Sequence, residues 1–199
     1  MSPALQSEST GDQCVDERLA LQRLLEVSSV VLGQGIDLVN NSLTSNDQLV
    51  AQSKYIPGST IGKHLRHARD HFALLLDCVS SDTTKPLNYD LRSRNTPMEN
   101  DRLAADQAFK QTIAQLEAIV PRTSLDKPLT LNAVTPYPQT METTFGRELW
   151  FAALHAVHHW SMVRVIAGEL GIELEESFGF APSTLVYQGS EAPLGRPKI

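Results

Sequence analysis

The sequence is poor in cysteine and lacks any long hydrophobic run. Its 199 residues include two cysteines, Cys14 and Cys78, which cannot form a disulfide framework and are typical of a reducing compartment. No stretch approaches the ~20 apolar residues that a membrane span requires. Residues 1–14 also lack the apolar segment of a signal peptide. These absences predict a cytoplasmic protein without a membrane partner.

The chain also lacks an excess of positive charge. Its net charge of -6 and its pI near 5.5 argue against binding to nucleic acid, which requires clustered cations. The contents of 41% hydrophobic and 20% charged residues are ordinary for a globular protein. This length suffices for one domain with a sizeable core and is short for two.

Four segments show the periodicity and boundary signals of long helices. Apolar residues recur at helical spacing, and Gly171 ends the last segment. Ser59 or Thr60 can cap the second segment, while Thr96 and Glu99 form a capping box that predicts the start of the third. The predicted helices span residues 15–43, 60–80, 97–120 and 144–170.

A short β-hairpin is expected between the third and fourth helices. Residues 129–134 alternate in the manner of a strand, and residues 139–144 can pair with them. The predicted fold class is therefore all-α, a four-helix bundle with a short β-hairpin. We expect a disordered leader, the bundle and a flexible tail, at residues 1–14, 15–186 and 187–199.

All six histidines lie in two short windows of the predicted helices. In the second helix, His64, His67 and His71 share one shoulder of an apolar stripe, whereas the charged residues cover the far side. The helical wheel does not choose among these three histidines. The charged residues predicted on the far side are Lys63, Arg66, Arg69, Asp70 and Asp77.

In the fourth helix, His155 and His159 lie four residues apart on one apolar face, so both imidazoles can hold one ion. His158 lies about 100° further round the helix and points elsewhere. A set of three neutral histidines suits Zn²⁺, Ni²⁺ or Fe²⁺ and leaves coordination positions open. The alternative is a structural network in which the histidines satisfy one another.

The chain resembles the DinB/YfiT-like superfamily of metalloenzymes, which includes bacillithiol S-transferase-like proteins. Three stretches in a fixed order carry the resemblance, which covers about residues 20–186. They are HARDH at 67–71, YDLRSR at 89–94 followed by TPME at 96–99, and HAVHH at 155–159 with the downstream FGFAPSTL at 178–185.

This resemblance implies a four-helix bundle in which His67, His155 and His159 bind a divalent metal. It also implies a metal-dependent transferase that joins a low-molecular-weight thiol to a small electrophile. Tyr89, Arg92 and Arg94 would then hold an anionic cosubstrate, although a solvated loop is the alternative for them. No individual catalytic residue is predicted.

Two other functions stay open at this point. One is a metal-dependent hydrolase, in which the open position carries hydroxide. The other is a non-catalytic bundle that binds a ligand or dimerises. A homodimer stays open in every case, because bundles of this type often pair.

Overall fold

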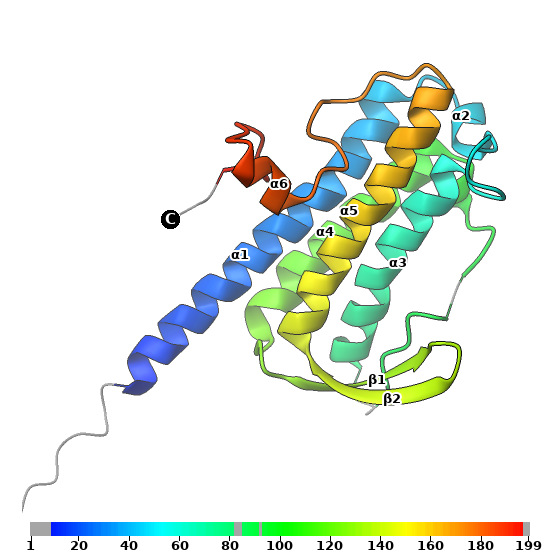
Figure 1. Ribbon diagram of the computed structural model, residues 1–199. Coiled ribbons are helices and arrows are strands. Elements are labelled where there is room, and N and C mark those ends of the chain that lie inside the picture. Colours follow the sequence, from blue (N-terminus) through cyan, green and yellow to red (C-terminus); the bar gives the residue numbers. More distant parts are fainter. Residues whose placement is uncertain (1–8, 82–84, 92, 197–199) are drawn as a thin grey trace, which may run out of the picture.

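The protein is mainly helical, with one small antiparallel sheet (Figure 1). The computed structural model describes residues 9–81, 85–91 and 93–196, with side chains from residue 16 onward. The elements, in chain order, are the helices and strands α1 (Ser9–Asp37), the π-helical turn η1 (Leu38–Ser42), α2 (Asp47–Val50), α3 (Ile61–Ser80), the 3₁₀ turn η2 (Pro97–Glu99), α4 (Arg102–Ile119), the 3₁₀ turn η3 (Val120–Arg122), β1 (Pro128–Val134), β2 (Pro138–Thr144), α5 (Phe145–Glu169) and α6 (Pro182–Tyr187).

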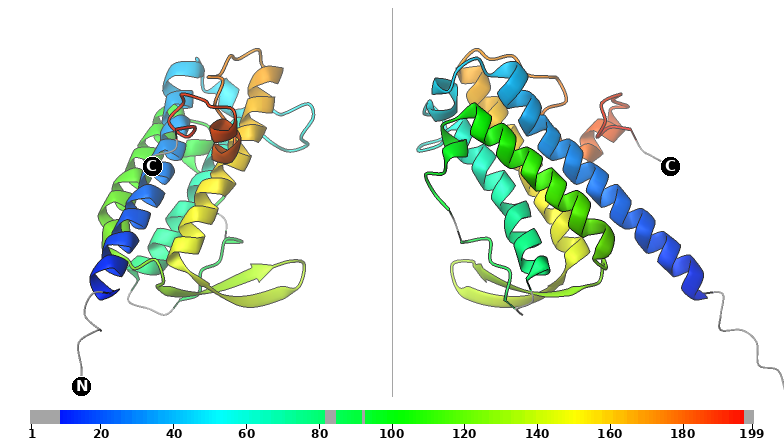
Figure 2. Two further views of the ribbon diagram at one scale, coloured as in Figure 1. Left: turned by 60° about the vertical axis from the view of Figure 1, so that its left-hand side comes forward. Right: turned by 180° about the vertical axis from the view of Figure 1, so that it is seen from behind.

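The long helices α1, α3, α4 and α5 lie alongside one another (Figures 1 and 2). Helix α3 contacts α4 and α5, and α1 contacts the same two helices. Trp160 Nε1 on α5 donates a hydrogen bond to the Val31 carbonyl on α1, at 2.9 Å. The core between the helices contains large, fully buried side chains, among them Trp160, Phe72, Phe109, Phe145, Leu32, Leu65 and Leu75.

The predicted ends of the second and fourth helices are confirmed. The Thr60 side chain caps α3 by accepting a hydrogen bond from the Lys63 N–H, and Thr144 caps α5 in the same way. Gly171 follows α5 with a φ of 68°, a conformation that favours glycine.

The predicted start of the third helix is wrong. Residues 97–99 form only the turn η2, in which the Glu99 carboxylate accepts a hydrogen bond from the Thr96 N–H at 3.2 Å. The helix α4 begins at Arg102, because the Asp101 side chain accepts hydrogen bonds from the N–H groups of Leu103 and Ala104. The stronger cap therefore lies five residues further along the chain.

The predicted hairpin is confirmed by β1 and β2. The strands pair antiparallel, with Leu129 opposite Thr143. The hairpin lies across the end of the molecule at which α3 ends and α5 begins (Figure 1). Thr144 is both the last residue of β2 and the cap of α5, so the hairpin directly sets the start of that helix.

The predicted leader and tail are only partly described. Residues 1–8 and 197–199 lie outside the described residues, and α1 begins at Ser9, within the predicted leader. In the tail, Leu194 is buried against the core. Among the described residues, no helix is both long enough and apolar enough to span a membrane. The domain boundaries and the compartment stay predictions.

Two glycines of α1 give a matched test of the packing between α1 and α4. A Cβ at Gly35 would lie 2.9 Å from the ring of Phe109, which is fully buried, whereas a Cβ at Gly33 would meet no atom within 4 Å. We expect Gly33→Ala to raise the free energy of unfolding by about 0.5–1 kcal/mol through helix propensity. Gly35→Ala should lower it, because the buried ring cannot move freely.

Denaturant unfolding of both variants measures this difference. An equal gain in stability for the two alanines would contradict the close contact at Gly35.

Candidate metal centre

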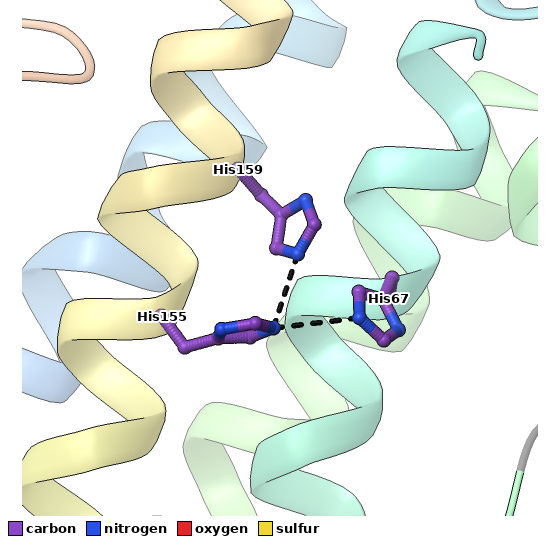
Figure 3. A group of neighbouring side chains, drawn as sticks. All are labelled: His67, His155 and His159. Carbon is purple, nitrogen blue, oxygen red and sulfur yellow. Dashed lines mark hydrogen bonds between the residues drawn. The ribbon is translucent and has the colours of Figure 1, made fainter. Parts of the chain in front are cut away.

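Three histidines from two helices meet between α3 and α5. Figure 3 shows the rings of His67 from α3 and of His155 and His159 from α5 pointing toward one another. The Nε2 atoms of His155 and His159 are 3.1 Å apart, and those of His155 and His67 are 3.4 Å apart. One ligand atom from each residue lies within 4.8 Å of the other two. The structure thus brings together the three residues that the resemblance implied as ligands, of which the helical pattern alone indicated His155 and His159.

The helical spacing accounts for this arrangement. His155 and His159 are four residues apart on α5 and therefore lie one turn apart on one face. That face meets α3, which supplies His67. His158 is exposed, as predicted from its position on the helix. The pair on α5 is thus a local feature, whereas His67 joins it only through the packing of two helices.

The other two histidines of α3 surround the site. His64 Nδ1 lies 2.8 Å from His159 Nδ1, so one of these two atoms donates to the other. His71 is buried, and its Nδ1 lies 3.1 Å from the backbone oxygen of His67. When His159 Nδ1 donates to His64, its Nε2 lone pair faces His155 and is available as a ligand.

The central ring nitrogens lie close to one another in more than one pair. His155 Nε2 lies within 3.4 Å of two other Nε2 atoms. A neutral ring nitrogen carries either one proton or one lone pair, so it can make only one well-directed hydrogen bond. One cation placed among three lone pairs would satisfy all three nitrogens at once. The three converging nitrogens are thus an arrangement that could hold one cation.

Burial lowers the pKa of two histidines in this region, His64 and His159. Loss of solvent is the main cause that lowers the pKa of His159 to about 2, and the neighbouring imidazoles His155, His67, His64 and His158 lower it further. Loss of solvent also lowers the pKa of His64 to about 4, with a smaller contribution from His158. Near neutral pH both rings are therefore uncharged, which is the form that binds a metal.

Arg66 departs from its predicted position on the solvated far side of α3. Its side chain is 8% exposed and lies 3.2 Å from both the Glu99 and Asp70 carboxylates. Desolvation raises the pKa of Asp70, and the two arginines Arg66 and Arg69 partly offset that rise. The helical wheel misplaced Arg66 because η2, which carries Glu99, covers this side of α3.

A pocket of about 530 Å³ opens beside the histidines. Its wall includes His67 and His159, so a small molecule in the pocket could reach these two candidate ligands. The remaining lining residues are mostly polar or charged, namely Ser59, Lys63, His64, Arg66, Arg94, Asn95 and Glu99.

The predicted cosubstrate loop divides into separate parts in the structure. Arg94 lines the pocket, whereas Arg92 lies outside the described residues. Tyr89 stacks on His71 and donates a hydrogen bond to the Glu148 carboxylate at 3.0 Å. Glu148 is 3% exposed and also accepts a hydrogen bond from Thr143. A carboxylate beside Tyr89 is unfavourable for an anion, so Tyr89 does not fit the predicted role.

Sequence reasoning missed Glu148. A glutamate in the first turn of a helix is ordinarily explained by the helix dipole. Its burial arises from the neighbouring hairpin and from the segment that carries Tyr89, which are distant in the sequence. No local pattern distinguishes it.

The comparisons with known proteins give one informative relative. No family model matches the chain, and no solved structure matches it. The chain is 36% identical over 170 residues to FK506-binding protein 5 of Rhizopus delemar. The match covers 82% of this chain and 37% of that protein, so the chain spans well under half of its relative.

This similarity corrects two predictions. The resemblance to the DinB/YfiT-like superfamily is wrong, since the match over most of the chain is to an FK506-binding protein. The metal-dependent thiol transferase is overturned by the same finding, because the relative is named for binding FK506. The comparison does not test the three histidine ligands, which stay a prediction.

The contact between Tyr89 and Glu148 predicts a dependence of stability on alkaline pH. Burial, followed by the Glu148 charge and its hydrogen bond, raises the pKa of Tyr89. Above pH ~10 the unfolded chain releases this phenolic proton and the folded chain retains it. The free energy of unfolding should therefore fall as the pH rises above ~10.

The decrease should be smaller in Tyr89→Phe, because phenylalanine has no proton to lose. Urea unfolding of both proteins between pH 8 and pH 11 measures the effect. Parallel curves for the two proteins would show that Tyr89 ionises alike in the folded and unfolded chains.

Proposed function

We propose that α1, α3, α4 and α5 form a four-helix bundle that binds one divalent transition-metal ion through His67, His155 and His159. The observation that carries this proposal is the double contact of His155 Nε2, which one hydrogen bond cannot satisfy. The ligands would be neutral imidazoles, with His64 and His71 holding the rings and the backbone around them.

The nitrogen separations support this assignment. Zinc binds histidine nitrogen at about 2.0–2.1 Å in tetrahedral sites, which places two ligand nitrogens about 3.3 Å apart. The two measured separations of 3.1 and 3.4 Å lie close to that value. All three ligand atoms lie within 4.8 Å of one another, and an ion would draw them together. Three nitrogen ligands suit Zn²⁺, Ni²⁺ or Fe²⁺ and leave at least one position for water or a ligand.

Variants of two histidines on α5 test the metal site. We expect His155→Ala to lose stoichiometric metal, because it removes the ligand that contacts both of the others. His158→Ala is the matched control, since His158 is exposed on the same helix. Metal content per chain is measured by mass spectrometry on protein without a purification tag, after incubation with Zn²⁺, Ni²⁺ or Fe²⁺ and removal of free ion.

The expected result is about one ion per chain for the wild type and for His158→Ala. Full metal content in His155→Ala would rule out the proposed site. Equal losses in both variants would indicate general histidine binding rather than a defined centre.

A second candidate function follows from the relative. Its name describes a protein that binds FK506, and we extend that binding to this chain as a proposal. FK506 is a largely apolar macrocycle, and a pocket of about 580 Å³ between α1 and η3 has apolar side chains on its wall. They include Leu21, Leu25, Val120 and Pro121.

Titration calorimetry with FK506 tests this second candidate. We expect saturable binding by the wild type and a loss of binding in Leu25→Arg, which places a charge in the apolar wall. If the wild type does not bind FK506, this second candidate function is wrong. The FK506 binding named for the relative would then lie outside the 37% of its length that this chain spans.

A further inference from the structure

The pocket beside the histidines carries more positive than negative charge, although the whole chain has a net charge of -6. Its lining residues include three cations, Lys63, Arg66 and Arg94, and one carboxylate, Glu99. A local excess of cations in an acidic protein indicates a site that attracts anions.

The three cations differ in whether they form ion pairs with carboxylates of the protein. Arg66 is paired with both Glu99 and Asp70, so its charge is offset within the protein. Lys63 and Arg94 make no ion pair with any described residue. Lys63 Nζ donates to the Gly58 carbonyl at 2.7 Å, which uses one of its three protons. Lys63 and Arg94 therefore supply the uncompensated positive charge.

The surrounding backbone adds to this charge. Ser59, Lys63 and His64 lie at or just before the first turn of α3, a helix of 20 residues. The N-terminal end of a helix carries a partial positive charge and favours anions nearby. Lys63 lies on α3 and Arg94 on the segment before η2, so a ligand between them would contact two separate parts of the chain.

We propose that this pocket binds the oxyanion group, a carboxylate or a phosphate, of a small molecule. Arg94 pairs with two oxygens of the group, as guanidinium groups commonly do, and Lys63 supplies a point charge. The volume of about 530 Å³ falls within the usual range for small-molecule sites. The remainder of the ligand reaches His67 and His159. Contact of that remainder with an ion rests on the proposed metal site, whereas oxyanion binding does not.

Calorimetric titration of metal-free protein at low salt tests the proposal. The probes are succinate, glycerol 3-phosphate and succinamide, the last being a neutral match for succinate. We expect at least one of the two anions to bind, and succinamide to bind at least about tenfold more weakly. Arg94→Gln and Lys63→Gln should each weaken anion binding by about tenfold.

Arg147→Gln is the control, because Arg147 is an exposed arginine of α5 that does not line the pocket. It should leave anion affinity within about twofold of the wild type. Anion binding that is no tighter than that of succinamide, or that is unchanged in Arg94→Gln, would overturn the proposal. The anion that binds more tightly identifies the carboxylate or the phosphate as the preferred group.

The His155→Ala variant separates this proposal from the metal site. It should lose metal and keep anion affinity within about twofold, because Lys63 and Arg94 are intact. If the wild type binds no metal but still binds the anion, only the proposed metal site is wrong. If the protein binds metal but not the anion, only the proposal of oxyanion binding is wrong.

Discussion

The contact between α3 and α5 places polar imidazoles from two helices inside a mainly apolar structure. Buried ring nitrogens must find partners, since each unsatisfied polar group costs on the order of 1–3 kcal/mol. Neighbouring side chains supply some of these partners. His64 Nδ1 is hydrogen-bonded to His159 Nδ1, and His71 Nδ1 to the backbone oxygen of His67. The ring nitrogens of His67, His155 and His159 converge at the centre of this contact, and that convergence is the basis of the proposed metal site.

Helix α3 also packs closely against η2, in the segment before α4. Gly62 lies so close to η2 that a Cβ there would fall 2.0 Å from the Glu99 carbonyl oxygen. This approach brings the Glu99 carboxylate to Arg66 and closes one wall of the pocket beside the histidines. The histidine cluster and the charged pocket therefore both depend on residues of α3. The Glu99 carboxylate pairs with Arg66 and not with Lys63 or Arg94.

The similarity to an FK506-binding protein over most of the chain was not indicated by the histidine pattern. Helix geometry places any two residues four apart on one face, so unrelated helical proteins can arrive at the same pair of ligands. The pair His155 and His159 predicts a place where an ion can bind, but it identifies neither the ancestry nor the reaction. Similarity over 170 residues carries more information about descent than three short stretches do.

Local features follow from the sequence alone: four long helical segments, the hairpin, two of the four long-helix starts, and the shared face of His155 and His159. Periodicity and caps act over a few residues, so they can be read without a fold. The tertiary structure decided which histidine of α3 joins the pair, and it buried Arg66 and Glu148 and brought Arg94 to the pocket. These placements depend on how distant segments pack, and one helical wheel contains no information about its neighbours.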